Sequence, residues 1–295
     1  MAHSEGQGER GTGTVVVVGG GLMGSGIAHA FLVAGRRVEL LEVDASVAAA
    51  SRARIRQHLE ESARRGRLEE GVERAMSRLE VHKSGDALAA AEDVAVAIEA
   101  VPEMVRLKLE VLALLERVVP EEALLATNTS SIAIGELAAG LARPGRFVGL
   151  HFFNPVPASL LVEIVVGATT TPATVERARS LVEPLGKQAI VVRDSPGFAT
   201  SRLGVLLGLE AIRMLEEQVA TPEDIDRAMT LGYKHPVGPL HLTDLVGLDV
   251  RLAVADYLRP LLGERFEAPS LLREKVARGE LGRKCHRGFF SYPEP

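Results

Sequence analysis

The sequence predicts an α/β protein, in which a doubly wound sheet is followed by a smaller all-helical domain. From Thr14 onward, short apolar runs rich in β-branched residues alternate with longer helical stretches. Several of these runs are apolar at successive residues, which is typical of parallel strands covered on both faces. After Asp194 the strand-like runs stop, and apolar residues recur at helical spacing.

The elements of the sheet domain can be placed in order along the chain. The expected strands are Val15–Val18, Val38–Glu42, Val94–Ile98, Leu124–Thr127, Arg146–Leu150, Leu161–Val165 and Ala189–Val192. The expected helices are Met23–Ala34, Val47–Arg65, Leu68–Arg78 and Glu103–Val118. This β–α–β alternation favours a layered structure with helices on both faces of the sheet.

A domain boundary is predicted at Asp194-Ser195-Pro196, which divides the chain into a sheet domain (14–194) and a helical domain (195–295). Residues 1–13 are polar and glycine-rich and are expected to form a disordered tail. In the helical domain, Thr221 followed by Pro222 indicates the capped start of a helix. The helical domain contains an apolar stripe that is larger than a domain of this size can bury by itself. We therefore expect a homodimer through residues 195–295. The stripe consists of Leu203, Leu206, Leu207, Glu210, Ala211, Met214 and Leu215.

Composition narrows the function classes. The chain has 295 residues, and its 34 basic and 39 acidic residues give a net charge of −5, which argues against nucleic-acid binding. It contains no apolar run of the length a membrane helix needs, and no signal-like run precedes Thr14. One cysteine forms no internal disulfide and no cysteine-rich metal site. We therefore expect a cytoplasmic enzyme that acts on a small molecule and needs no metal.

A glycine-rich turn follows the first strand. Val15–Val18 runs directly into Gly19-Gly20-Gly21-Leu22-Met23-Gly24, a G-x-G-x-x-G pattern between a strand and a helix. Gly19 permits the tight turn, Gly21 lets the backbone approach a pyrophosphate, and Gly24 lets the helix pack closely on the strand. The N–H groups at the helix start, from Leu22 and Met23 onward, carry positive partial charge toward the phosphates. The pattern predicts a Rossmann-type dinucleotide site.

An acidic residue ends the second strand. Glu42 lies 18 positions after Gly24, where a carboxylate can accept hydrogen bonds from the adenosine ribose hydroxyls. The same carboxylate would repel a 2′-phosphate, so the sequence favours NAD over NADP as the cofactor. Asp44, two residues further on, is the rival for this role.

An ordered series of motifs resembles one family closely, the L-3-hydroxyacyl-CoA dehydrogenases, including the bacterial 3-hydroxybutyryl-CoA dehydrogenases. The resemblance covers nearly all of residues 14–292 and implies reversible, NAD-dependent oxidation of an (S)-3-hydroxyacyl-CoA to the 3-ketoacyl-CoA. The motifs that carry it are Thr127-Asn128-Thr129-Ser130-Ser131, His151-Phe152-Phe153-Asn154-Pro155-Val156-Pro157, Glu163 and Pro196-Gly197-Phe198.

Two of these residues suit alcohol oxidation chemically. The reaction needs a proton acceptor, and His151 is the best candidate because histidine gains and loses a proton near neutrality. Glu163, expected on the next strand, can accept the other ring N–H, which fixes the tautomer and stabilises the imidazolium. The family's matching His and Glu form this pair.

The resemblance also assigns supporting roles. It places Ser130 and Asn154 beside the substrate oxygen or the histidine, and Asn128, Glu103 and Lys108 beside the cofactor. It places Arg65 in a helical hairpin that contacts the phosphates of coenzyme A. Each position also has a purely structural interpretation, because Ser and Asn often cap turns and charged residues often cover a solvated helix face. The hairpin is rich in cations, with Arg52, Arg54, Arg56, Arg64, Arg65 and Arg67.

The chain departs from the family pattern at one substrate-facing position, where Ser201 stands in place of the usual Asn. Serine keeps a donor and an acceptor but reaches less far. This change leaves open a non-catalytic NAD-binding homologue. A second alternative is a dehydrogenase of carnitine or gulonate type with the same architecture. Those enzymes tend to carry His-Pro-x-Asn-Pro, so Phe152 favours the acyl-CoA substrate.

Overall fold

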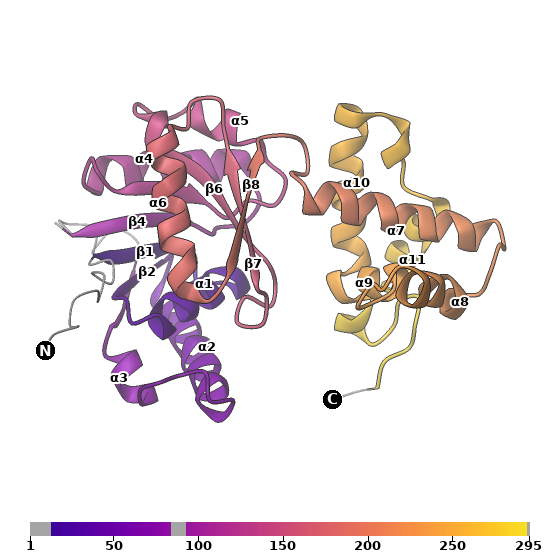
Figure 1. The fold of residues 1–295 in the computed structure, drawn as a ribbon, viewed down its shortest axis with the longest axis horizontal. Helices are drawn as coiled ribbons and strands as arrows, with labels where there is room; N and C mark the ends of the chain where they lie inside the picture. Colours follow the sequence, from indigo (N-terminus) through magenta and orange to yellow (C-terminus); the bar gives the residue numbers. More distant parts are fainter. Residues whose placement is uncertain (1–12, 84–92, 294–295) are drawn as a thin grey trace, which may run out of the picture. The chain divides into compact units, whose positions relative to one another are not determined.

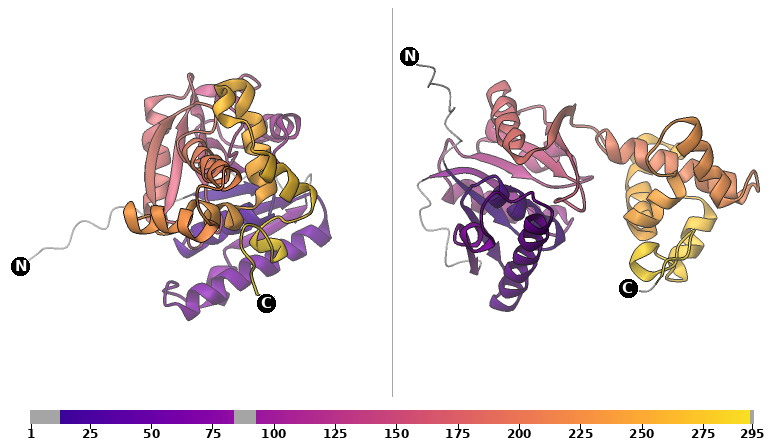
Figure 2. Two further views of the ribbon diagram at one scale, coloured as in Figure 1. Left: turned by 90° about the vertical axis from the view of Figure 1, so that its right-hand side faces the viewer. Right: turned by 60° about the horizontal axis from the view of Figure 1, so that its bottom comes forward.

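The structure is a computed structural model that describes residues 13–83 and 93–293. The chain divides into two compact units, which join between Asp194 and Ser195. Figures 1 and 2 show each unit from several directions. The first unit is α/β and the second is helical, so the predicted fold class is confirmed.

One eight-stranded sheet forms the first unit's described part, in the order β3-β2-β1-β4-β5-β6-β7-β8. The order reverses between β1 and β4, which is the topological switch point of a doubly wound sheet. The strands are β1 (Thr14–Val18), β2 (Val38–Glu42), β3 (Leu79–Lys83), β4 (Val94–Glu99), β5 (Leu124–Thr127), β6 (Phe147–Phe152), β7 (Leu161–Val166) and β8 (Gln188–Arg193).

The sheet is parallel except at β7, which runs antiparallel to β6. The loop between them is too short for a crossover helix, so the chain must turn back on itself. β8, at the sheet edge, is also less covered than expected, because Ile190 and Val191 remain 37% and 38% exposed. The mainly apolar runs at β7 and β8 therefore identified these strands correctly but did not fix the direction of β7 or the burial of β8.

Strand β3 was not predicted. The sequence predicts a helix over Leu68–Arg78, whereas the structure has only the short α3 (Val72–Met76) before β3. The strand's residues, Leu-Glu-Val-His-Lys, alternate apolar and charged, and only Leu79 is fully buried. Such an edge strand gains its stability from pairing with β2, which a local pattern does not reveal.

Helices cover both faces of the sheet. On one face, α1 (Leu22–Val33), α2 (Ala45–Arg64) and α6 (Pro172–Val182) pack in a single core cluster with Val15 and Val17 of β1. Val16 points the other way, as alternation along a strand requires. The buried leucines of α4 (Val105–Val118) and α5 (Ile134–Ala138) lie outside that cluster, as expected for helices on the opposite face.

The second unit is built from helices around its own core. They are α7 (Thr200–Glu216), α8 (Pro222–Arg227), α9 (Pro239–Val246), α10 (Leu248–Leu262) and α11 (Ser270–Ala277). Thr221 caps α8 by accepting a hydrogen bond from the Asp224 N–H, as its sequence indicates. Nowhere in the described residues does a helix combine the length and apolar character needed to cross a membrane.

The predicted stripe of α7 is confirmed in part. Ala211 is buried, and Leu206, Met214 and Leu215 pack against the core. Glu210 is exposed, and the core also takes Val205, Leu209 and Ile212 from outside the stripe. Leu203 is 68% exposed. The helix is apolar over most of its circumference, so periodicity alone does not decide which side faces the core.

Candidate active site

The glycine turn leaves a space over Gly21 and the start of α1. Gly19 has a positive φ of +93°, and a Cβ added at Gly24 would lie 1.7 Å from the Gly19 carbonyl oxygen. Neither position therefore tolerates a side chain. A Cβ added at Gly21 would instead meet no atom within 4 Å, so this backbone is open to a ligand.

The N-terminus of α1 suits an anion. Gly21 is the N-cap residue, no side chain caps the helix, and its first turn contains no acidic residue. The backbone N–H groups of Leu22, Met23 and Gly24 are among the first four of the helix, which lack partners within it. Helix N-termini of this kind bind phosphate groups, so the predicted turn fits a dinucleotide.

Glu42 forms hydrogen bonds with the glycine turn itself, which the sequence does not indicate. Its Oε1 accepts hydrogen bonds from the Gly20 N–H (2.5 Å) and the Ser51 hydroxyl (2.9 Å), and the residue is 6% exposed. The carboxylate therefore ties the turn to α2. Its rival, Asp44, is the N-cap of α2 and accepts hydrogen bonds from the Ser46 and Val47 N–H groups.

A buried charge network lies at the carboxyl end of β4. Lys108, 1% exposed on α4, places its Nζ 2.8 Å from Glu99 Oε1 and 3.1 Å from Glu103 Oε2. Lys108 therefore does not belong to a solvated helix face. Glu99, which is not among the residues predicted from the sequence, also accepts hydrogen bonds from the Val101 N–H and the Thr127 hydroxyl. The only sequence signal for it was a charged residue directly after an apolar strand.

Glu103 holds the loop that contains Ser130. Its Oε1 accepts hydrogen bonds from the Thr129 hydroxyl (2.5 Å) and from the Ser130 N–H (3.1 Å) and Ser131 N–H (3.2 Å). Burial alone would raise the pKa of the Glu103 carboxyl. The charge of Lys108 and the hydrogen bonds outweigh burial, so this pKa is lowered.

His151 and Glu163 form a buried pair across the β6–β7 hairpin. The two residues are directly opposite in the antiparallel register, and Nδ1 of His151 lies 2.7 Å from Oε2 of Glu163. His151 is 6% exposed and Glu163 is completely buried. Beside a carboxylate Nδ1 carries the proton, which leaves Nε2 as the proton acceptor of the neutral ring.

Two neighbours hold the histidine strand in place. Asn128, directly after β5, accepts a hydrogen bond from the Phe152 N–H through Oδ1 (2.9 Å). The Phe153 ring lies 4.3 Å from the His151 ring, centroid to centroid. Asn128 thus connects the ends of β5 and β6. The carboxyl ends of β1, β4, β5 and β6 lie at one edge of the sheet because these strands are parallel.

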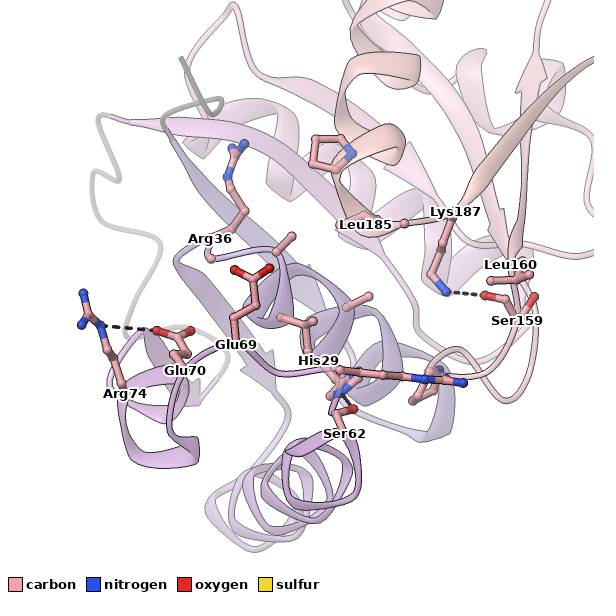
Figure 3. Close-up of a pocket in the computed structure, with 18 residues that line it drawn as sticks. His29, Arg36, Ser62, Glu69, Glu70, Arg74, Ser159, Leu160, Leu185 and Lys187 are labelled. Atoms are coloured by element: carbon pink, nitrogen blue, oxygen red, sulfur yellow. Dashed lines mark hydrogen bonds and ion pairs between the residues drawn. The ribbon is translucent and has the colours of Figure 1, made fainter. Parts of the chain in front are cut away.

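Asn154 and Arg65 line a common pocket. This pocket, of about 140 Å³, also involves His58 of α2 and the loop after β6, and Asn154 itself is exposed. A larger pocket of about 790 Å³ lies between α1, the residues after α2 and the start of β8 (Figure 3). Arg67 of the cation-rich hairpin lines the larger pocket, but none of the predicted catalytic or cofactor-binding residues does.

The arginines of the α2 hairpin separate into two groups. The side chains of Arg52, Arg54 and Arg56 are engaged within the unit, with the Leu79 carbonyl, the Gly20 carbonyl and Glu73 respectively. Arg65 and Arg67 are exposed, and within residues 13–83 and 93–293 no hydrogen bond or ion pair holds their side chains. Of the six arginines, these and Arg64 remain available for a phosphorylated ligand.

Ser201 lies in the first turn of α7, in the second unit.

The fold and this site define a class of protein. A doubly wound sheet with a phosphate-binding turn at its switch point, and a buried His–Glu pair at the same edge, is a dinucleotide-dependent dehydrogenase. Residues 14–195 match the NAD binding domain of 3-hydroxyacyl-CoA dehydrogenase, and residues 197–292 match its C-terminal domain. The chain belongs to the 3-hydroxyacyl-CoA dehydrogenase family; it is an oxidoreductase with NAD as its cofactor.

Individual relatives are similar over nearly their full length. A probable 3-hydroxybutyryl-CoA dehydrogenase of Bacillus subtilis is 40% identical over 282 residues, covering 95% of this chain and 97% of the relative. The mitochondrial hydroxyacyl-coenzyme A dehydrogenase of Sus scrofa is 36% identical, covering 94% and 90%. The crystal structure of (S)-3-hydroxybutyryl-CoA dehydrogenase from Ralstonia eutropha matches with a TM-score of 0.89 at 38% identity, covering 96% of this chain and 100% of that one.

The lowered pKa of Glu103 predicts a pH-dependent stability. Because the folded pKa lies below the unfolded value near 4.5, the ionised carboxylate stabilises the fold above that pH. This contribution is lost as the pH falls through the folded pKa. Glu103→Gln should therefore lower the free energy of unfolding by about 1 kcal/mol at pH 7, and by less below pH 4.5.

Urea unfolding of both proteins across this pH range measures the difference. Glu110→Gln is the matched control, because Glu110 forms an exposed pair with Arg106 on the same helix. Removing an exposed pair should cost less at every pH. A Glu103→Gln deficit that stays constant with pH would contradict the assignment.

Proposed function

We propose that this protein catalyses the reversible oxidation of short-chain (S)-3-hydroxyacyl-CoA to 3-ketoacyl-CoA, with His151 as the general base and acid. The observation that carries the proposal is the buried 2.7 Å contact between His151 Nδ1 and Glu163 Oε2. A histidine held in this way presents Nε2 in a fixed direction and in the tautomer that accepts a proton.

The names of the relatives support the substrate. Proteins about 40% identical over almost the whole chain are named 3-hydroxybutyryl-CoA dehydrogenases, which favours a four-carbon thioester. Phe152, buried at the end of β6, points to the acyl-CoA branch of the architecture and away from carnitine or gulonate enzymes. Parallel assays with acetoacetyl-CoA, carnitine and gulonate separate the three, and turnover of none would leave a non-catalytic NAD-binding protein.

In the oxidation, Nε2 of His151 takes the proton of the substrate's 3-hydroxyl group. NAD, held at the glycine turn, would supply the hydride acceptor for C3 in this direction and the hydride donor in the reduction. Glu163 stabilises the imidazolium that forms, because its carboxylate is buried and lies 2.7 Å from a ring directly opposite. In the reduction, Nε2 returns the proton to the developing alkoxide.

Further residues are proposed to hold the two ligands. Ser130, Asn154 and Ser201 would contact the substrate beside its 3-oxygen, and Arg65 would bind the phosphates of coenzyme A. The backbone of Gly19, Gly21 and Gly24, with the helix start at Leu22 and Met23, would hold the pyrophosphate. Glu42, Glu103, Lys108 and Asn128 would shape the cofactor site, mainly through the loops that they anchor.

His151→Ala should lower kcat by about 10²–10⁴-fold, because the hydroxyl proton then lacks an acceptor at the right place. Steady-state assays with 3-hydroxybutyryl-CoA and NAD measure the loss, and NADH binding shows that the cofactor site is intact. His29→Asn is the control, since His29 is an equally buried histidine (4% exposed) that bonds Ser62 instead. A His151→Ala enzyme within about threefold of the wild-type kcat would refute the role.

Glu163→Gln should lower kcat with little change in the affinity for NADH. The amide keeps the volume of the side chain but loses the negative charge that stabilises the imidazolium, so the pH dependence of kcat should also change. The pH profile distinguishes this role from a purely structural one. An unchanged profile together with an unchanged kcat would rule it out.

We also propose a homodimer through the second unit. Exposed apolar side chains support it, with Leu203 68%, Leu231 72% and Tyr233 75% exposed. Sedimentation velocity at micromolar concentration should give about twice the 31.5 kDa mass of the chain, and Leu203→Asp should shift the equilibrium toward monomer. Wild-type protein that sediments only as a monomer would exclude this interface.

A further inference from the structure

Helix α10 carries an arginine in its core stripe. The buried residues of this helix are Leu248, Arg251, Ala255 and Leu258, which recur at the spacing of one helix face. Arg251 is 6% exposed, which is close to the complete burial of its apolar neighbours on the stripe. A guanidinium group remains charged at neutral pH, so the interior of the second unit contains a positive charge.

Nothing in residues 13–83 and 93–293 neutralises this charge. The Nε atom of Arg251 is buried without a hydrogen-bond partner, no ion pair reaches the side chain, and only the two Nη atoms keep some contact with solvent. The buried carboxylates of the unit are committed elsewhere, Asp244 to the Phe289 and Phe290 N–H groups and Asp226 to the Leu240 and His241 N–H groups. Burial lowers the pKa of the Arg251 guanidinium to about 10. A buried charge without a counter-charge destabilises a fold, so its presence calls for a function.

Helix α7 makes room for this side chain with two glycines. A Cβ added at Gly208 would lie 3.9 Å from Nε of Arg251, and a Cβ added at Gly204 would lie 3.3 Å from Nη1. The side chain therefore extends along α7 from Gly208 toward Gly204, and its charged end points toward the helix start. Ser201 is three residues further in that direction, about 4.5 Å along the axis. Both Ser201 and Gly204 are partly exposed.

We propose that Arg251 binds a carboxylate at the far end of the acyl group, so that the preferred substrates are CoA thioesters of short 3-hydroxy dicarboxylic acids. This rests on the proposed function, in which Ser201 contacts the substrate beside its 3-oxygen. An acyl group that starts at Ser201 and follows α7 reaches the guanidinium within about one helical turn. The planar guanidinium matches a carboxylate with two parallel hydrogen bonds, and the ligand supplies the counter-charge that the chain lacks.

The test compares kcat/KM for 3-hydroxybutyryl-CoA with that for thioesters of increasing length whose acyl group ends in a second carboxylate. Wild-type enzyme should prefer one of the dicarboxylic substrates. Arg251→Met should reduce that preference by about 10- to 100-fold, the range for lost charged hydrogen bonds, and leave 3-hydroxybutyryl-CoA almost unaffected. Arg251→Lys keeps the charge without the paired donors and should fall between the two.

Arg259→Met is the matched control, because it removes an exposed cation of the same helix that pairs with Glu264 and Glu267. It should leave the preference unchanged. A wild-type enzyme that oxidises 3-hydroxybutyryl-CoA without preferring any dicarboxylic substrate overturns this inference alone. An Arg251→Met enzyme, or an Arg251→Lys enzyme if the first does not fold, that keeps the full preference also overturns it. A wild-type enzyme that oxidises none of the thioesters overturns the proposed function as well.

Discussion

The proposed chemistry of this protein depends on one cross-strand hydrogen bond, between His151 and Glu163, and that bond depends on a reversal of chain direction. β6 enters the sheet parallel to β5, and β7 returns antiparallel to β6. The hairpin brings Glu163 back to the same edge of the sheet, directly opposite His151. A parallel neighbour would require a crossover connection and would set the facing pairs in a different register. The pair lies in the interior, where the ring and the carboxylate interact with little screening by solvent.

Three carboxylates hold the loops at the same edge of the sheet. Glu42 holds the glycine turn, Glu99 holds the residues that follow β4, and Glu103 holds the loop of Ser130. Each accepts backbone N–H groups that regular secondary structure leaves without partners, so each sets the path of one loop. The start of α1 is the exception, since it has neither an acidic residue nor a side-chain cap. These carboxylates therefore position loops, and the start of α1, where the proposed pyrophosphate site lies, has no negative side chain of its own.

The second unit shows how far local patterns go. The helix α7 and the cap at Thr221 follow from spacing and from known cap preferences. The buried face of α7 follows only in part, because apolar residues surround most of that helix and packing against α9 and α10 completes the choice of face. Arg251 was also missed, although the sequence contains a signal for it: an arginine on an apolar stripe, and two glycines four residues apart on α7. Either feature alone is common, and their contact becomes visible only in three dimensions.

The sequence by itself determined the α/β class, the phosphate-binding turn and the identity of the His151–Glu163 pair, because each depends on residue types within a short stretch or at a recognisable spacing. Tertiary structure decided which partners the charged side chains around the site contact. It committed the Glu42 carboxylate to the turn, buried Lys108 between two glutamates, and engaged Arg52, Arg54 and Arg56 while leaving Arg65 exposed. It also reversed β7 and added β3. The reason is physical: strand pairing and burial join residues far apart in the chain, and a local pattern contains no record of which distant group will be the partner.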